Sequence, residues 1–448
     1  MSTTLPTAEQ RRALGREARS NQSRAAQGEW RAGPRRGDPI AALRAVDAAR
    51  IPTLLPLRYG RMRESAFAYM RGTAAVMAAD LGLQPSSGLH AQSSGDAHLM
   101  NFGSYASPEG RPVFDLNDFD ETLAAPFEWD VKRLATSLAM AAAEQGASSR
   151  EARALARRGA RLYRMQMNAF AAVPPLKMWR AQIDLAAAIE AISARDARHT
   201  ERKSLAVRLA ASGDLAKHLI AANGTLQLPE RPPGVFRLGP QEAVAHTAFA
   251  MWRAGLAPEI RALMDRFELR DVAFKAVGIG SVGTFCALGL FADADGGALI
   301  LQLKQAQESV LEGVAGASPF ANHGQRVVVG QRIVQASPDP LLGWSGADAD
   351  GRCYYVRQMK DARLASVGDR IAAEALKAYA GLCARTLAHA HARGGEAATL
   401  AGYMGGGEAF ENAVAAFAMA YAAQIRDDFA LFSAAIDRGE LPRSDRPR

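Results

Sequence analysis

The segment VGIGSVGTFCALGLFADADGGALILQLKQA, residues 277–306, decides the fold class of this chain. Its two apolar runs belong to strand-like stretches at residues 271–292 and 298–306, and the turn-forming sequence ADADGG joins them. Such a pattern is typical of a β-hairpin. Long helical patterns fill most of the remaining chain. We therefore expect a helix-rich α+β protein with a small β-rich lobe.

Glycines of this segment form a GxGxxG pattern, which is a weak signal by itself. A dinucleotide-binding fold needs a helix directly after the third glycine, whereas strand-like residues follow here. In protein kinases a glycine-rich loop covers the phosphates of ATP, and a lysine on the third strand binds them. By this pattern Gly278, Gly280, Ser281 and Gly283 would cover the nucleotide, and Lys304 would bind its phosphates. The alternative is a glycine-rich hairpin with a solvated lysine.

Two further features fit a nucleotide-binding lobe. Glu308 or Glu312, on a short helix expected after the hairpin, would pair with Lys304. The sequence CYYVRQM predicts a strand that leads into a hinge, where Gln358 and Met359 would contact the nucleotide.

A second set of candidate residues begins at SSGDAHLMNFG, residues 93–103, and continues in VFDLNDFDE. Asp96 and Asn101 are five positions apart, and Asp118 follows Asn101 by 17 positions on the far side of a predicted strand. A kinase catalytic loop has an Asp and an Asn at this spacing, and its metal-binding Asp opens a D-F-x tripeptide. Asp96 would act on the attacking hydroxyl, and Asn101, Asp118 and Asp120 would hold Mg²⁺. The alternative is a polar turn that caps helices.

Other charged residues near these loops have both a structural and a functional interpretation. Asp130 precedes an amphipathic helix, where its carboxylate can cap backbone amides and brace the metal loop; capping alone is favoured over a catalytic role. His98 has no HExxH or cysteine partner, so loop hydrogen bonding is favoured over metal ligation. Arg61, Arg63 and Arg71 are solvated helix charges or contacts to phosphate, with Arg71 the strongest candidate.

The order of the two sets is reversed relative to an ordinary kinase, because Asp96 precedes Gly278 by about 180 residues. The chemistry depends on spatial position and not on chain order. A circularly permuted kinase-like fold accounts for both sets.

Several motifs resemble the bacterial family catalogued as domain of unknown function 2252, over about residues 28–440. They are RYGRMRESAFAYMRG at 58–72, GDAHLMNFG, NDFDET, EWDVKRLATS, GIGSVGT and YYVRQMKD. A more distant similarity is to aminoglycoside phosphotransferases and other kinase-like enzymes. It implies that Asp96 is the base, that Asn101 and Asp118 bind magnesium and that Lys304 binds phosphate. In two places the sequence departs from that pattern: Ser94 stands where a His often precedes Gly-Asp, and Asp120 stands where protein kinases have Gly.

Composition excludes several classes of protein. The chain has 448 residues, of which 48% are hydrophobic and 22% charged, so it is not a mainly disordered or fibrous protein. The net charge is +8, and residues 1–44 account for +5 of it with nine Arg against four acidic residues. The excess charge therefore predicts a basic N-terminal arm, and nucleic acid is not an expected partner.

The expected location is the cytoplasm. Cys286, Cys353 and Cys383 are widely spaced, which fits a reducing compartment. The N-terminus lacks the apolar region of a secretory signal, and the longest uncharged run, residues 276–292, is too short to span a membrane.

The pattern of segments predicts four parts. A flexible basic arm covers residues 1–37, a helical lobe with the catalytic and metal loops 38–260, a small β-rich nucleotide-binding lobe 261–360, and C-terminal helices 361–448. Helices are expected at residues 40–55, 67–81, 128–145, 149–173, 371–393 and 409–438, and a strand at 325–335. Residues 193–246 have no clear pattern.

The leading hypothesis is an ATP- and magnesium-dependent phosphotransferase acting on a hydroxyl of a small-molecule acceptor. No activation segment ending in A-P-E is present, which speaks against a protein kinase, and GxSxG, HExxH and Walker A sequences are absent. A nucleotide-binding regulatory protein without turnover and a nucleotidyl transferase on the same fold stay open as alternatives. The acceptor and the oligomeric state stay open as well.

Overall fold

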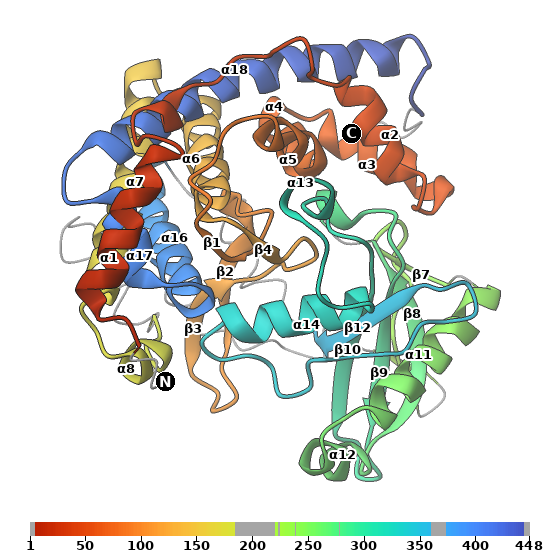
Figure 1. Cartoon of the computed structure of the whole chain (residues 1–448). Helices are drawn as coiled ribbons and strands as arrows, with labels where there is room; N and C mark the ends of the chain where they lie inside the picture. Colours follow the sequence, from red (N-terminus) through yellow and green to blue (C-terminus); the bar gives the residue numbers. More distant parts are fainter. Residues whose placement is uncertain are drawn as a thin grey trace.

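The computed structural model describes residues 5–183, 220–222, 225–237, 239–276, 278–359 and 373–442. It is a helix-rich α+β structure with a large helical lobe and a smaller lobe built on a sheet (Figure 1). Most of the patternless stretch 193–246 lies outside the described residues. No helix of the described residues has the length and apolar character needed to cross a membrane.

The helical lobe is formed by both ends of the chain. Its helices are α1 (Ala8–Glu17), α2 (Pro39–Asp47), α3 (Leu55–Met62), α4 (Ala66–Gly72), α5 (Ala74–Gly82), α6 (Phe127–Glu144), α7 (Ser149–Phe170), α8 (Pro175–Trp179), α16 (Ala373–Gly394), α17 (Ala397–Met404) and α18 (Ala409–Asp437). Aromatic rings from α6, α7, α17 and α18 meet in its core, where Phe127 packs against Tyr163, Tyr403 and Phe410. Helices α6, α7, α16 and α18 confirm the expected long helices, apart from residues 371 and 372, which lie outside the described part.

Two short antiparallel ribbons inside this lobe carry the candidate catalytic and metal loops. Strand β1 (His90–Ser93) pairs with β4 (Leu123–Pro126), and β2 (Phe102–Ala106) pairs with β3 (Pro112–Leu116). The loop after β1 and the loop after β3 therefore lie side by side.

The smaller lobe is a six-stranded antiparallel sheet in the order β11-β12-β10-β9-β8-β7. Its strands are β7 (Val235–Phe236), β8 (Glu268–Lys275), β9 (Cys286–Ala292), β10 (Ala298–Ala306), β11 (Gly343–Trp344) and β12 (Cys353–Gln358); a separate ribbon is formed by β5 (Ile220–Ala222) and β6 (Thr225–Gln227). The β9–β10 pair confirms the predicted hairpin. Its helices are α11 (Glu242–Ala254), α12 (Pro258–Met264), α13 (Glu312–Ala315) and α14 (His323–Val334). Strand β7 and α11 belong to this lobe, which therefore begins before residue 261, the expected boundary.

The strand expected at residues 325–335 is wrong, because this segment is helix α14. Its run of valines favours a strand by propensity alone. However, Gly324, Val327, Val328, Gln331 and Val334 are buried with the spacing of one helix face, and Asn322 caps the first turn by accepting from the Gln325 amide. Packing of that face and the cap override the propensity.

The expected helices at 40–55 and 67–81 are each interrupted. Helix α2 ends at Asp47, and α3 begins only at Leu55. Helices α4 and α5 are separated at Thr73, whose backbone is not helical (φ −123°, ψ 44°). Because of the second break, α5 has an N-terminus of its own, and this end of the helix lies inside the lobe.

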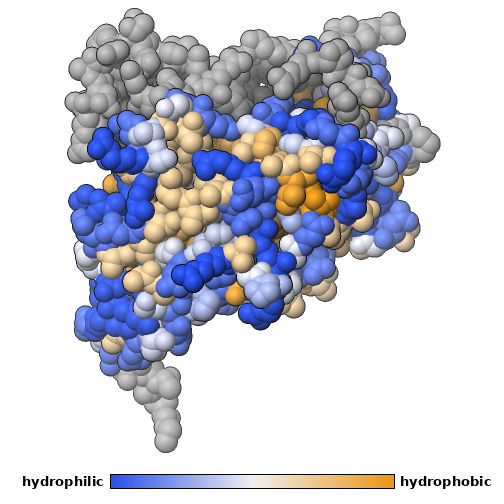
Figure 2. All heavy atoms as spheres, turned by 90° about the horizontal axis from the view of Figure 1, so that it is seen from above, coloured by the Kyte–Doolittle hydropathy of each residue, from blue (hydrophilic) through white to orange (hydrophobic). Residues whose placement is uncertain are grey.

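The N-terminal segment differs from the expected flexible arm, because residues 5–37 are folded onto the helical lobe. Arg19 donates to the carbonyls of Gly402 and Tyr403 at the end of α17, and Arg36 pairs with the buried carboxylates of Asp80 and Asp428. Several of the arginines that suggested a basic arm, such as Arg19 and Arg36, therefore have partners on distant parts of the chain. Figure 2 views the molecule from the side along which α18 runs, where hydrophobic side chains form a band between hydrophilic ones.

Candidate functional site

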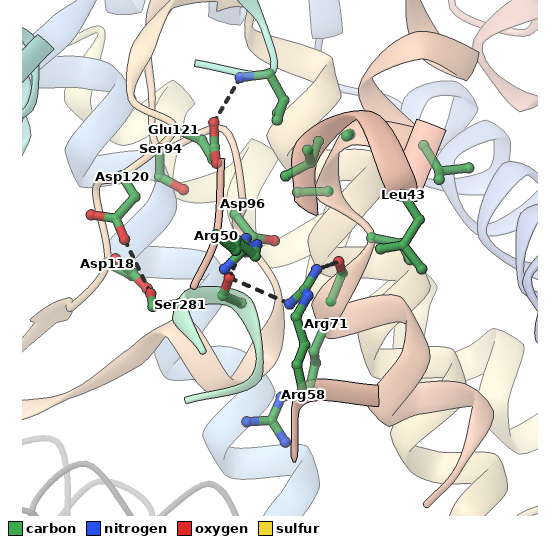
Figure 3. A pocket seen from close by; sticks show the side chains of 18 residues that line it. Leu43, Arg50, Arg58, Arg71, Ser94, Asp96, Asp118, Asp120, Glu121 and Ser281 are labelled. Carbon is green, nitrogen blue, oxygen red and sulfur yellow. Dashed lines mark hydrogen bonds between the residues drawn. The ribbon is translucent and has the colours of Figure 1, made fainter. Parts of the chain in front are cut away.

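A cavity that is partly open to solvent lies where the two lobes meet. The N-terminus of α5, the loops after β1 and β3, and the glycine-rich segment between β8 and β9 all line it. In Figure 3, Asp118 and Asp120 lie on one side of this cavity and Arg58 and Arg71 on the other, with Asp96 between them. The cavity thus brings together residues from both of the predicted sets.

Lys304 links the sheet to the metal loop. From β10, its Nζ lies 2.6 Å from Asp120 Oδ2 and 3.5 Å from Asp118 Oδ1. Asp120 also accepts from the Tyr355 hydroxyl at 2.6 Å and from the Ser281 hydroxyl at 3.1 Å. One carboxylate therefore joins the lysine strand, the neighbouring strand β12 and the glycine-rich segment.

These contacts keep both the Asp120 carboxylate and the Lys304 ammonium group charged. Burial alone would raise the pKa of Asp120, but Lys304, Tyr355 and Arg357 together lower it to about 2. Burial opposes the charge of Lys304 as well, yet Asp118, Asp120 and Tyr355 raise its pKa well above the ordinary value. Both groups are ionised at neutral pH, so the pair is a true ion pair.

Asp96 is positioned by the loop that follows β1. Its carboxylate accepts from Arg133 Nε at 2.5 Å, and its backbone carbonyl accepts from the Asn101 side-chain amide at 2.8 Å. Burial raises the pKa of Asp96 to about 7, with a further contribution from Asp118, although Arg133 lowers it. A carboxylate with this pKa accepts a proton near neutral pH, which is what a general base requires.

The Asp96 loop lies very close to the metal loop. Gly95 has φ +79°, and a Cβ at this position would lie 2.4 Å from the carbonyl oxygen of Glu121. Only glycine fits both the left-handed backbone and the close approach.

Asp130 holds the loop that carries Asp96 in place. Its carboxylate, in the first turn of α6, accepts from the backbone amides of Ser94 at 2.7 Å and Gly95 at 3.1 Å. His391 of α16 lies 3.2 Å from the same carboxylate and 2.8 Å from the Tyr163 hydroxyl. The favoured interpretation, capping of the helix alone, is therefore wrong: Asp130 lies within the first turn of α6, and its carboxylate holds the loop after β1 instead of the metal loop.

The glycine-rich segment is held down by two buried arginines. Arg50 donates to the carbonyls of Gly280 and Val282, and Arg58 donates to the carbonyl of Ile279. Both guanidinium groups also contact Asp47. The segment is therefore docked on α3 and on the connection between α2 and α3, at the rim of the cavity.

The structure brings some predicted residues to the cavity and not others. Gly280, Ser281, Asp96, Asp118, Asp120 and Arg71 line it. Gly283 lies beside Arg50, and Gly278 begins the turn that contains Ser281. Gln358 and Met359 lie at the end of β12, where Met359 packs on the sheet.

The expected partner of Lys304 is wrong. Glu308 is exposed, and Glu312 instead lies 3.6 Å from both Arg326 and His323. Asp120 and Asp118 pair with Lys304 in place of the expected glutamates, because the loop after β3, which carries both aspartates, lies next to β10.

Two other predicted residues have structural roles. His98 caps a turn by accepting from the Met100 amide, and burial together with Arg133 and Arg71 lowers its pKa well below the ordinary value. It is a neutral hydrogen-bonding residue, as the favoured interpretation held. Arg63 pairs with Asp437 at the surface.

Magnesium ligands were expected at Asn101, Asp118 and Asp120. Within the described residues, no group of three His, Cys, Asp or Glu side chains is arranged to hold a metal. Lys304 pairs closely with Asp120 and less closely with Asp118, and both carboxylates line the cavity, with side chains 28% and 32% exposed. Carboxylate and amide oxygens suit Mg²⁺, which keeps several waters and uses few protein ligands. The Asp118 carboxylate and the Asn101 side-chain oxygen therefore suit such an ion by their chemistry, but only Asp118 lines the cavity, and the Asn101 side-chain nitrogen donates to the Asp96 carbonyl.

Several residues of the site were not predicted from the sequence. Tyr355 and Arg357 lie on β12, and Arg133 follows Asp130 by one helical turn. A polar residue at every second position of a buried strand, as in YYVRQ, was the available signal for Tyr355 and Arg357.

Searches of curated proteins and of solved structures returned no match. A family model described as an uncharacterized protein conserved in bacteria matches residues 50–435. This match includes every residue of the cavity except Leu43 and Val46. The chain therefore belongs to the bacterial family DUF2252.

Proposed function

We propose that this protein is an ATP- and magnesium-dependent phosphotransferase that acts on a hydroxyl group of a small molecule. The observation that carries the proposal is that Lys304, which is buried behind the cavity lining, pairs with Asp118 and Asp120, and that these two carboxylates line the cavity together with Asp96. A phosphate-binding lysine, a metal-binding carboxylate and a base are the parts that phosphoryl transfer needs at one cavity.

The arrangement of the sheet supports a kinase-like nucleotide lobe. The glycine-rich segment connects β8 and β9, and the lysine lies on β10, the third strand of this antiparallel run. Helix α14 follows β10, as the αC helix follows the lysine strand of a kinase. It has no acidic residue, and Asp120 supplies the lysine's partner instead.

A close contact supports the proposed circular permutation. Gly394, the last residue of α16, lies against β1, and a Cβ on Gly394 would lie 2.5 Å from the Cβ of Gln92. In an unpermuted kinase-like chain a long helix leads into the catalytic loop. Here α16 ends beside the strand that leads to Asp96, so the helix and the loop adjoin in space without being consecutive.

The roles of the side chains follow from their contacts. Asp96, held by Arg133, would accept the proton of the acceptor hydroxyl as its oxygen attacks the γ-phosphorus and ADP leaves. Lys304 would bind phosphate oxygens from its position above Asp118. Magnesium, held by Asp118 and Asn101, would neutralise charge on the phosphates.

A regulatory protein that binds nucleotide without turnover is the second candidate. The observation in its favour is that Lys304 is paired with Asp120 at 2.6 Å, so a nucleotide has to compete with that carboxylate for the lysine. Nucleotidyl transfer at the same site uses the same lysine and metal ligands and differs in which phosphorus is attacked.

Thermal unfolding with and without ATP and Mg²⁺ tests nucleotide binding. A ligand at 100 times its Kd adds about 2.7 kcal/mol to the unfolding free energy. We expect this shift in wild type and its loss in Lys304→Ala and Asp118→Asn, each compared with its own ligand-free melting. The exposed residues Lys177 and Asp295 provide the matched controls Lys177→Ala and Asp295→Asn. No shift in wild type at millimolar ATP would exclude a nucleotide site.

Asp96→Asn separates an enzyme from a regulatory protein. An active phosphotransferase loses turnover in this variant and keeps its ATP-induced shift. Release of labelled ADP or pyrophosphate across a panel of hydroxyl acceptors distinguishes phosphoryl from nucleotidyl transfer.

A further inference from the structure

We propose that the N-terminus of α5 and the hydroxyl of Ser94 form an oxyanion subsite, which binds a phosphate or carboxylate group carried by the acceptor. The assignment to the acceptor rests on the proposed phosphotransferase function, whereas the oxyanion subsite itself does not. The assignment to the acceptor narrows the substrate to a small molecule with both a hydroxyl and an anionic group.

Helix α5 begins inside the cavity without a side-chain cap. Thr73 occupies the N-cap position, but its hydroxyl donates backwards to the carbonyls of Tyr69 and Met70. Ala74, Ala75 and Val76, the first turn of α5, line the cavity. Amides of a first helical turn have no partner within the helix, and the helix dipole adds partial positive charge there. This end of α5 is therefore suited to an anion.

Ser94 supplies an independent sign of a ligand. The residue is 1% exposed, and its Oγ has no hydrogen-bond partner among the described residues. The backbone amide of Ser94 donates to Asp130, which fixes the position of the residue. Ser94 lines the cavity, and Figure 3 shows its oxygen turned toward the interior. A buried hydroxyl without a partner is costly, and an oxyanion would satisfy it.

The charges around this subsite allow an anion. Arg50, Arg58 and Arg71 contribute three positive charges to the lining. Four acidic residues also line the cavity: Asp96 is paired with Arg133, Asp118 and Asp120 are paired with Lys304, and Glu121 accepts from the Val310 amide. Arg50 and Arg58 share the carboxylate of Asp47.

The position of the subsite favours the acceptor over the nucleotide. Ser94 precedes Asp96 by two residues, so an anionic group at its hydroxyl would place the rest of the molecule beside the base. Lys304, which would bind the nucleotide phosphates, lies on the Asp118 side. Figure 3 shows Asp118 and Ser94 on one side of Asp96 and Arg71, which lies three residues before the first residue of α5, on the other.

The test titrates inorganic phosphate into the full-length protein by calorimetry in a phosphate-free buffer, with and without saturating ATP and Mg²⁺. Ala75→Asp places a carboxylate at the half-buried first turn of α5, where it repels an anion and favours the helix dipole. We expect at least a tenfold loss of phosphate affinity in Ala75→Asp without a lower melting temperature, and a smaller loss in Ser94→Ala. Ala79→Asp, at an exposed position of the same helix, should bind phosphate as wild type does.

Three results would overturn the proposal: no saturable phosphate binding, equal affinity in Ala75→Asp and Ala79→Asp, or displacement of phosphate by ATP and Mg²⁺. The last result would assign the subsite to the nucleotide. Failure of the proposed function would give a different result. The protein would then bind no ATP but would still bind phosphate, and Ala75→Asp would still weaken that binding. In that case the oxyanion subsite would stand, and its assignment to the acceptor would be wrong.

Discussion

Arg133, in the second turn of α6, donates from Nε to Asp96 Oδ1 across 2.5 Å. The Arg133 side chain is buried, and its guanidinium is itself fixed by a hydrogen bond to the carbonyl of Met70. Two opposite effects therefore act on the pKa of Asp96: burial raises it, and Arg133 lowers it. The net result is a pKa of about 7, far above that of an ordinary aspartate.

This pKa predicts how turnover depends on pH. Asp96 has to be ionised to accept a proton, so kcat/KM should rise with pH and reach half of its plateau near pH 7. A pH profile of kcat/KM for any acceptor that is turned over measures this midpoint. A profile that is flat from pH 5 to 8 would contradict the role of Asp96.

The same shift predicts a pH dependence of stability. The pKa of Asp96 is higher in the folded protein than the value of about 3.9 in an unfolded chain, so the folded state binds the proton more tightly. Its contribution to the unfolding free energy is fully present below about pH 4 and is lost as pH rises through about 7. The loss is at most about 4 kcal/mol. Denaturant unfolding at pH 5 and pH 8 should show a smaller pH dependence in Asp96→Asn than in wild type, and an equal dependence would exclude this assignment.

The local parts of the site could be predicted because their signals are short in sequence. The β9–β10 hairpin follows from a turn between two apolar runs, and Asp96, Asn101 and Asp118 follow from spacing within 23 residues. The pairing of Lys304 with Asp120 could not be predicted this way, because it spans 184 residues and depends on how the lobes meet.

The folded N-terminal segment shows the same limit. Its arginines suggest a solvated arm when they are considered within their own stretch of sequence. Arg36, for example, pairs with Asp428, which lies 392 residues away. The break at Thr73 was missed for another reason: both helices are rich in alanine and apolar residues, and the deviation is confined to one backbone position.

Arg36 should be required for stability. It pairs with Asp80 at 2.9 Å and Asp428 at 2.6 Å, and the two carboxylates are 3% and 1% exposed at the side chain. Arg36→Ala leaves two buried carboxylates without this cation, which should lower the unfolding free energy by about 3–5 kcal/mol. Arg35→Ala, at the exposed neighbouring position, is the control and should change it by less than about 0.5 kcal/mol. Equal effects in denaturant unfolding would show that the N-terminal segment does not depend on these contacts.

Asp130 should affect turnover more than nucleotide binding. Asp130→Ala removes the acceptor of two buried loop amides, which should cost about 2–5 kcal/mol of unfolding free energy. The loop that carries Asp96 loses its brace, so kcat should fall at least tenfold while the ATP-induced thermal shift changes little. The exposed Asp427→Ala on α18 serves as the control. A weaker ATP shift with unchanged kcat would place Asp130 in nucleotide binding instead.

Arg50 should keep the glycine-rich segment docked. Its guanidinium donates to the carbonyls of Gly280 and Val282 at 2.8 and 2.7 Å. Arg50→Met preserves much of the apolar stem, and Arg58 remains to pair with Asp47. Amide exchange over residues 278–285, followed by mass spectrometry, should therefore become at least tenfold faster in Arg50→Met.

The control for this variant is Arg44→Met. Arg44 is exposed and donates to the carbonyl of Glu440, away from the glycine-rich segment. If the docked segment is the state that closes the cavity, ATP and Mg²⁺ should restore more protection to residues 278–285 in wild type than in Arg50→Met. Unchanged exchange in Arg50→Met would mean that the contacts of Arg58 with Ile279 and Gly280 hold the segment without it.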